Sequence, residues 1–346
     1  MPQSSAYQDS GVDIAAATRA NQLMAEAVHS THTPAVLAGM GSFGGCFDLA
    51  ASTNKGSVLV SSTDSVGTKT LVAAAVGRYD TVGQDLVNHC INDILVQGAR
   101  PLFFLDYIAV AKLEPLQIAD LVGGVAAACR NATCALVGGE TAELPDVYRD
   151  QAFDIAGTIV GIVERERMLP RDVVVGDAII ALPSTGLHTN GYSLARRIVA
   201  KTAATHALEH TPYVLRLPEL NHDTLGEALL AIHRPYLHEV EALWNAGVTL
   251  HALAHITGGG LYDNLPRVLP DGLGAVVRRG SWDIPPICSW LVHAGELAER
   301  EAFHVLNMGL GMLMVVPSED VHIALNAVSD ARLVGEITND AMVQLI

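Results

Sequence analysis

Apolar and polar residues follow the two periods of regular secondary structure along most of the chain. Over residues 81–99, apolar residues recur every three or four positions, which predicts an amphipathic helix. A second helix is predicted over residues 116–130. Short apolar runs predict a buried strand over residues 103–111 and further strands over residues 134–137 and 152–163. Strands interleaved with long helices are typical of an α/β or α+β fold, so we expect mixed sheets flanked by helices.

The remaining segments continue this alternation. A hairpin is predicted from two short strands, residues 46–49 and 58–62, joined by a turn at residues 54–56. The second half predicts further helices and strands, in the order 178–182 (strand), after 190 (helix), 225–244 (helices), 248–255 (strand), after 258–260 (helix), 274–277 and 313–316 (strands). The charged stretch 164–176 lies between the halves, so we expect two domains, residues 1–168 and 169–346.

The helix predicted over residues 81–99 carries an unusual set of polar residues. Asp85, Asn88 and Asn92 fall on one face, with Asp93 beside them. Asparagine and aspartate are poor residues for a helix interior, which suggests another demand at these positions. We interpret Asp93 as a metal-binding carboxylate; the alternative is a face that is simply in contact with water.

Composition narrows the classes of function. The formal net charge of −16 disfavours nucleic acid as a partner, although a small phosphorylated ligand can still be held by local groups. No apolar run reaches the roughly 18 residues of a membrane helix, and residues 1–13 do not resemble a signal peptide. Five cysteines without a C-x-x-C pair predict a protein of the reducing cytoplasm.

A glycine cluster at residues 39–45 fits the G-x-G-x-x-G pattern of dinucleotide-binding proteins. That pattern requires a long helix after its third glycine, whereas here a predicted turn and strand follow Gly44 closely. A glycine-rich flap over a ligand, including Gly41, Gly44 and Gly45, is the preferred interpretation; ordinary loop glycines are the alternative.

The segment 61–69 holds the groups that a triphosphate site needs. Asp64 can bind Mg²⁺, Thr68 offers a hydroxyl, Lys69 can balance phosphate charge, and the backbone can approach a ligand at Gly67. The alternative is the end of a strand with a helix cap. The Walker A pattern is absent from the sequence, so a P-loop enzyme is excluded.

Three further segments place glycines and polar groups after predicted strands. Glu140, within residues 138–143, is a candidate metal or substrate ligand, or else a surface acid in a tight turn. His188 is a candidate proton-transfer group, with Asn190 orienting it or a phosphate, although a lone histidine is more often structural. Gly258 and Gly259 precede a predicted helix whose N-terminus suits an anion, with an ordinary turn as the alternative.

Taken together, these segments resemble the phosphoribosylformylglycinamidine cyclo-ligase (AIR synthetase) family. The matching stretches run in order over nearly the whole chain and comprise residues 7–14, 44–49, 62–69, 80–83, 92–99, 101–107, 136–143, 186–193, 254–261, 264–270 and 303–309. The resemblance implies a two-domain AIR-synthetase-like fold, with an N-terminal ATP-binding and dimerising domain, and a homodimer. It also implies ATP and Mg²⁺, a phosphorylated ribonucleotide substrate, and purine biosynthesis.

On this interpretation, Asp64 and Asp93 hold Mg²⁺, with Glu140 as a weaker ligand, and Lys69 faces the phosphates of ATP. The alternatives are another ATP-using enzyme of the same superfamily, or a nucleotide-binding relative without catalysis.

The chain departs from the family pattern at three places. Glycine is usual where Ser65 stands, lysine where Gln8 stands, and a Pro-Thr-Arg segment where residues 232–236 read Ile-His-Arg-Pro-Tyr. Arg234 and Tyr236 are candidates to contact substrate phosphate in spite of this change.

Overall fold

The computed structural model describes residues 36–38, 45–48, 56–205, 212–220 and 224–346. In this part of the chain the strands form two six-stranded sheets. The first sheet has the order β1 (Val36–Ala38), β2 (Gly45–Asp48), β3 (Ser57–Ser65), β6 (Phe153–Glu164), β4 (Arg100–Val110), β5 (Ala135–Glu143). Its strands are antiparallel except for the parallel pair β4 and β5.

The second sheet has the order β12 (Val343–Leu345), β9 (Gly274–Val277), β11 (Arg332–Thr338), β7 (Ala178–Pro183), β10 (Leu310–Val316), β8 (Ala252–His255). Strands β7 and β10 are apolar along their whole length, and β8 and β10 are fully buried. A run of this kind indicates a strand covered on both faces. The predicted class of mixed sheets flanked by helices is confirmed.

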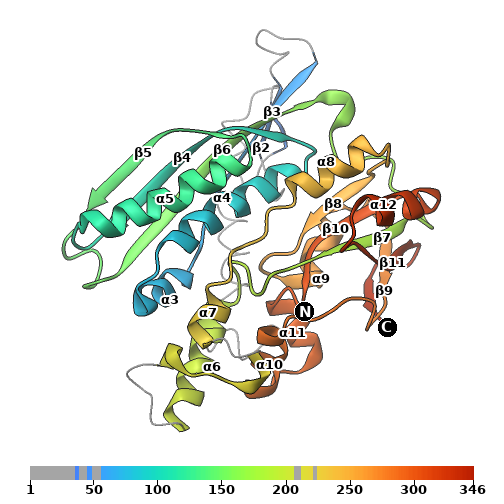
Figure 1. Ribbon diagram of the computed structural model, residues 1–346. Helices are drawn as coiled ribbons and strands as arrows, with labels where there is room; N and C mark the ends of the chain where they lie inside the picture. Colours follow the sequence, from blue (N-terminus) through green and yellow to red (C-terminus); the bar gives the residue numbers. More distant parts are fainter. Residues whose placement is uncertain (1–35, 39–44, 49–55, 206–211, 221–223) are drawn as a thin grey trace.

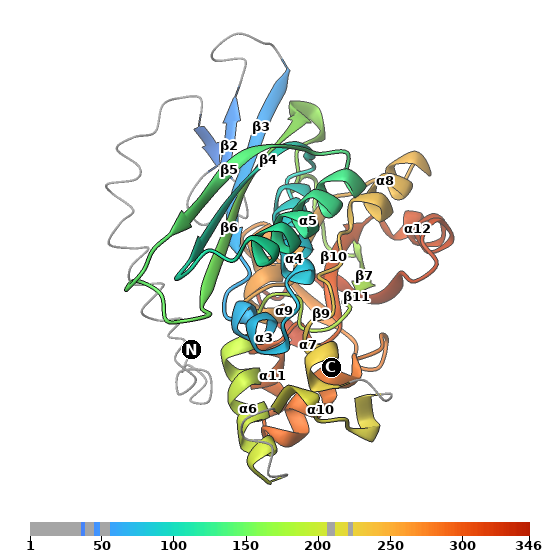
Figure 2. The ribbon, with the colours of Figure 1, turned by 60° about the vertical axis from the view of Figure 1, so that its left-hand side comes forward.

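The helices of the first domain cover one face of its sheet. They are α3 (Lys69–Val76), α4 (Asp80–Leu95) and α5 (Pro115–Asn131), and Figure 1 shows α4 and α5 side by side across the strands. When the molecule is turned, α4 lies between the first sheet and the second domain (Figure 2). This helix is therefore placed to carry residues that both domains contact.

The helices of the second domain are mostly short: α6 (Tyr192–Thr205), α7 (Leu225–Leu229), α8 (Leu237–Asn245), α9 (Gly260–Asn264), α10 (Pro286–Ala294), α11 (Glu299–Val305) and α12 (Val321–Ala327). Among the residues that the structure describes, no helix has the length and apolarity to pass through a bilayer. The expected boundary at residues 168 and 169 falls between the end of β6 and the start of β7.

Two glycines allow α4 and α5 to pack closely. A Cβ atom on Gly83 would lie 2.2 Å from the backbone oxygen of Leu121, and one on Gly124 would lie 2.1 Å from that of Asp80. Real Cβ atoms do not approach backbone so closely, so larger residues would push the helices apart.

Two predictions of secondary structure differ from the structure. The strand expected at residues 134–137 continues as β5 to Glu143, because the neighbouring β4 pairs with it throughout and offsets the poor strand propensity of its glycines. The strand expected to be buried, β4, is exposed on one face. The helix predicted after residues 258–260 is confirmed as α9, which begins at Gly260 and has five residues.

Candidate active site

Asp64 and Asp93 lie side by side at the junction of the domains. Asp64 comes from the end of β3, and Asp93 lies one helical turn after His89 on α4. The Nε2 atom of His89 is 2.9 Å from Oδ2 of Asp64 and 3.6 Å from Oδ2 of Asp93. Ser62 donates a hydrogen bond of 3.1 Å to Asp93. Two carboxylates predicted to share a site therefore face the same imidazole.

His89 and Asp64 each favour the charged form of the other. Burial disfavours a charged His89, but the adjacent Asp64 and Asp93 carboxylates raise its pKa to about 9. Burial likewise opposes ionisation of Asp64, yet His89 holds the pKa of that carboxyl below its ordinary value. The side chain of Asp64 is 40% exposed and that of Asp93 is 6% exposed, so the pair is reached from the Asp64 side.

The other polar residues of α4 bind the second domain. Asn88 donates to the backbone oxygen of His233 at 2.7 Å. Asn92 donates to the backbone oxygen of Arg234 at 2.9 Å and accepts from the backbone nitrogen of Tyr236 at 3.0 Å. All of these side chains are buried, so the alternative of a face in contact with water is wrong. Their hydrogen bonds to the backbone of residues 233–236 offset their low helix propensity.

The amine of Lys69 is enclosed by protein groups, which differs from the expectation that it faces the phosphates of ATP. Its amine lies 2.6 Å from Asp85, and both side chains are fully buried. It also donates to the backbone oxygens of His188 (3.0 Å) and Ala231 (2.8 Å). Burial lowers the pKa of Lys69, and the attraction of Asp85 opposes that shift. These three groups occupy the ammonium, so its role here is to hold two loops of the second domain.

A chain of buried histidines, which the sequence did not predict, lies behind the carboxylates. Nδ1 of His255 lies 2.8 Å from Asp93, and its Nε2 lies 3.0 Å from Nε2 of His233. Nδ1 of His233 lies 3.3 Å from the hydroxyl of Thr189, which is 2.6 Å from Nδ1 of His89. The spacing of His89 and Asp93, one turn apart on a predicted helix, was the available signal. The approach of His233 and His255 depends on tertiary packing.

His188 is also part of this interior group. It is 1% exposed, and its ring stacks on that of His233 with centroids 4.0 Å apart. Burial, with nearby positive groups, lowers the pKa of His188 well below its ordinary value. A neutral ring without access to solvent is poorly suited to exchange protons with a substrate, so this geometry does not support the predicted proton transfer.

Several other predicted residues converge beside the carboxylates. Thr68 lies within 3.2 Å of the hydroxyl of Ser193 at the start of α6. Gly67 lies against the backbone of Thr189, and Gly258 against the side chain of Asn190. The loops after β3, β7 and β8 therefore meet at one place, as expected for parts of one site. Gly259 has φ +93° and caps α9, a conformation that favours glycine.

Glu140 lies away from this group, which contradicts its assignment as a third ligand of the same metal. It is on β5 and pairs with Tyr107 of β4, while β6 separates β4 from β3. Three strand spacings of about 4.8 Å therefore separate Glu140 from the level of Asp64. The predicted tight turn is instead the extended end of β5, which carries Glu140 along the sheet edge.

The candidates for substrate phosphate in the altered segment already have partners. Arg234 forms ion pairs with Glu239 and, at 2.6 Å, with Asp330. The hydroxyl of Tyr236 donates to the backbone oxygen of Pro183 at 3.0 Å. The structure thus gives both residues an internal role.

The glycine-rich flap is described in part. Gly41, Gly44 and Gln8 lie outside the described residues, and Gly45 opens β2 opposite Ser61 of β3. A strand in place of a helix after Gly44 agrees with the rejection of a dinucleotide fold.

Comparison with known proteins identifies the family. The family model for the N-terminal domain of AIR synthase related proteins matches residues 41–163, and that for the C-terminal domain matches residues 174–346. A phosphoribosylformylglycinamidine cyclo-ligase of Geobacillus kaustophilus is 46% identical over 97% of this chain and 96% of its own length. The chain belongs to the phosphoribosylformylglycinamidine cyclo-ligase family. A cyclo-ligase of Desulfitobacterium hafniense, another member, is 48% identical over 91% of this chain and 90% of its own.

Solved structures of lower identity share the fold. A thiamine-monophosphate kinase of Stenotrophomonas maltophilia is 18% identical, with a TM-score of 0.61 over 94% of this chain and 93% of its own. The structure described as AaThiL complexed with AMPPCP and TMP is 14% identical, with a TM-score of 0.62 over 93% and 92%. Identities this low support the architecture alone.

Proposed function

We propose that this protein closes the imidazole ring of aminoimidazole ribonucleotide from formylglycinamidine ribonucleotide, at the expense of ATP. The observation that carries the proposal is the near-complete match to cyclo-ligases of the family, together with the meeting of Asp64 and Asp93 at one edge of the domain junction. A fold neighbour solved with AMPPCP, an analogue of ATP, adds support for a nucleotide in this architecture.

The chemistry addresses a poor leaving group. The formyl oxygen of the substrate attacks the γ-phosphoryl group of ATP, an oxygen–phosphorus bond forms, and ADP leaves. A substrate nitrogen then adds to the activated carbon, and phosphate departs with the former formyl oxygen. Such transfers depend chiefly on positioning and charge neutralisation, which the polar loops around Asp64 are placed to provide.

The residues present fit a magnesium ion. Asp64 and Asp93 offer oxygen donors from adjacent positions, and Mg²⁺ takes one or two carboxylates together with phosphate oxygens and water. When bound, the ion would supply positive charge to the transferring phosphoryl group. Thr68 and Asn190 lie at the same edge and would orient the substrates, and Lys69 would keep the loop of His188 in place.

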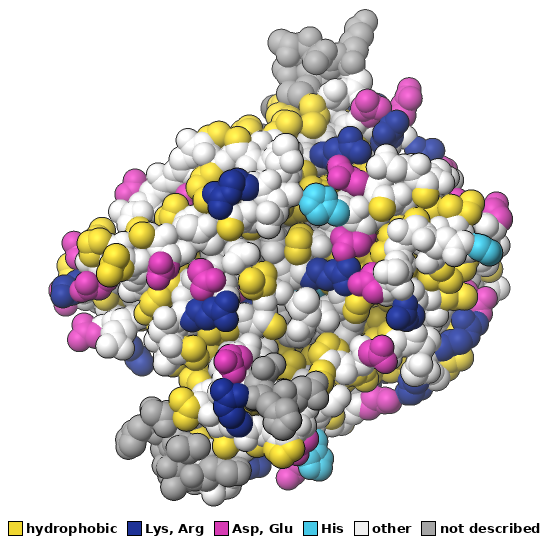
Figure 3. All heavy atoms as spheres, in the orientation of Figure 1, with side chains coloured by type: hydrophobic (Ala, Val, Ile, Leu, Met, Phe, Trp, Pro, Cys, Tyr) yellow, Lys and Arg dark blue, Asp and Glu magenta, His cyan; other side chains and the backbone are white. Residues whose placement is uncertain are grey.

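A small phosphorylated ribonucleotide suits the surface better than a nucleic acid. The net charge is −16, and on the face shown in Figure 3 the lysine and arginine side chains are interspersed with acidic and apolar ones. The five cysteines are buried and are not joined by disulfides, which supports the proposed cytoplasmic setting.

The proposal includes a homodimer that pairs the outer face of the first sheet. No described helix covers this face, and it exposes Phe47, Leu105, Tyr107 and Val137. An apolar sheet face of this kind marks an interaction surface, and a twofold axis lets the same face serve both subunits.

The test is a coupled assay of ADP release with formylglycinamidine ribonucleotide, with and without Mg²⁺. We expect release that requires both the ribonucleotide and the ion. ADP release with thiamine monophosphate in its place would identify another ATP-using enzyme of this fold, and ATP binding without ADP release from any substrate would identify a non-catalytic relative.

A further inference from the structure

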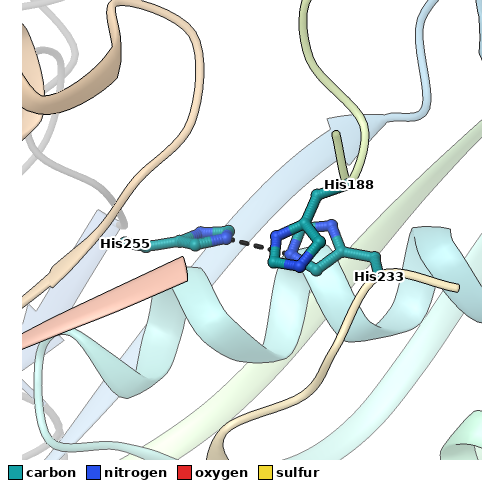
Figure 4. Close-up of side chains that lie close together, drawn as sticks. All are labelled: His188, His233 and His255. Atoms are coloured by element: carbon teal, nitrogen blue, oxygen red, sulfur yellow. Dashed lines mark hydrogen bonds between the residues drawn. The ribbon is translucent and has the colours of Figure 1, made fainter. Parts of the chain in front are cut away.

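Three histidines of the second domain gather beneath the paired carboxylates. His188, His233 and His255 come from the loop after β7, the segment before α8 and the end of β8 (Figure 4). Each is at most 1% exposed, and one ring nitrogen from each lies within 4.8 Å of the others. Sequence analysis interpreted His188 alone, and the proposed reaction leaves the group as a whole without a role.

In each ring, a neighbour holds one nitrogen and the other lies toward the group; Nε2 of His233 is also 3.1 Å from the side-chain nitrogen of Asn92. Asp93 holds Nδ1 of His255 at 2.8 Å, and Thr189 holds Nδ1 of His233 at 3.3 Å. The backbone nitrogen of Thr185 donates to Nε2 of His188 at 3.2 Å. Metal-binding histidines are typically oriented in this way, with the second nitrogen bonded to a carboxylate, hydroxyl or backbone group.

The remaining nitrogen of His188 is the most informative atom. Because Nε2 accepts a hydrogen bond, a neutral ring must carry its hydrogen on Nδ1, and this buried atom has no hydrogen-bond partner. A buried donor without a partner is costly. A metal ion in place of that hydrogen would remove the cost.

We propose that His188, His233 and His255 bind one divalent transition-metal ion of the zinc class, through Nδ1 of His188 and Nε2 of the other two. Imidazole nitrogens suit Zn²⁺, Co²⁺ and Ni²⁺, whereas Mg²⁺ requires oxygen ligands, so this site is chemically distinct from the pair of carboxylates. Three protein ligands leave one position of a tetrahedral ion for water.

Binding requires one adjustment that can be observed. The rings of His188 and His233 are 17° from parallel, whereas two imidazoles that share an ion must direct their lone pairs to one point. One of the rings must therefore turn about its Cβ–Cγ bond when the ion is bound. The ion would tie together three segments of the second domain and, through His255, the Asp93 side chain of the first.

The experiment measures binding of Co²⁺ to the untagged full-length protein after treatment with a chelator. We expect about one Co²⁺ per chain, with the strong visible absorption of a tetrahedral ion, and displacement by Zn²⁺ but not by Mg²⁺. The variants are His233→Thr, which removes the imidazole but keeps a small polar side chain, and His188→Asn, which suits the positive φ of this position. Each should weaken Co²⁺ binding by at least about 100-fold, since changes outside the ligand shell already cost 10–100-fold.

The matched control is His322→Gln, which removes an exposed histidine on α12 and should leave Co²⁺ binding unchanged. Circular dichroism and thermal melting without metal establish that each variant folds. The proposal is overturned if the wild-type protein binds no Co²⁺, if the absorption is that of an octahedral ion, or if both folded variants bind as well as the control. The ADP assay is independent of these readouts, so failure of the metal site leaves the proposed reaction untouched.

Discussion

Lys69 and Asp85 form an ion pair of 2.6 Å in which neither side chain is exposed. Removal of one partner leaves a buried charge uncompensated, which typically costs about 3–5 kcal/mol. We expect Lys69→Met to lower the free energy of unfolding by this amount. Denaturant unfolding followed by circular dichroism measures the change.

The double variant Lys69→Met/Asp85→Asn tests the cause. The amide removes the unpaired charge and retains an acceptor for the backbone nitrogen of His233, which bonds Asp85 at 2.7 Å. It should be more stable than Lys69→Met alone. Equal stability of the single and double variants would show that the loss comes from side-chain volume or from the backbone contacts of the amine.

The close packing of α4 and α5 predicts opposite effects at neighbouring glycines. Gly124→Ala places a Cβ against backbone and should destabilise the protein by about 1–3 kcal/mol. Gly123→Ala meets no atom within 4 Å and should be neutral or stabilising by up to about 1 kcal/mol, because alanine favours a helix. Thermal melting of the two variants measures the difference in stability. A similar loss of stability at both positions would contradict this account of the helix packing.

The carboxylates at the domain junction predict a loss of magnesium-dependent activity. Asp93→Asn and Asp64→Asn should each reduce kcat/KM for ADP release by about 100-fold or more and raise the Mg²⁺ concentration needed for half-maximal rate. Asp120→Asn, an exposed change on α5, is the control. Unchanged magnesium dependence in both site variants would remove these residues from the metal assignment.

The exposed face of the first sheet predicts the oligomeric state. Leu105→Glu places a charge in the centre of that face and should convert a homodimer to a monomer, which analytical ultracentrifugation measures directly. Leu113→Glu changes an equally exposed leucine in the loop after β4 and should leave the dimer intact. A wild-type protein that sediments as a monomer would refute the proposed pairing.

The sequence predicted the elements with strong local patterns and missed contacts made by distant segments. The spacing of apolar residues located α4 and α5 to within a few residues, and the separate interpretations of Asp64 and Asp93 led to two residues that do adjoin. The sequence around a polar residue does not show which distant group it contacts. Lys69 was therefore assigned to phosphate, whereas in the structure it pairs with the buried carboxylate of Asp85. Glu140 was misplaced because pairing between strands extended β5 past its glycines.

The buried polar side chains of α4 make the two halves of the chain depend on each other for hydrogen-bond partners. Separated from the second domain, the first would present Asp85, Asn88 and Asn92 without the backbone groups that they bond. The second would lose the side chains that fix residues 233–236. Exchange of one half for that of a distant relative would therefore have to transfer matching donors and acceptors along this helix. These hydrogen bonds restrict which halves can be combined in one protein, because a change in the α4 side chains requires a matching change in the segment that they bond.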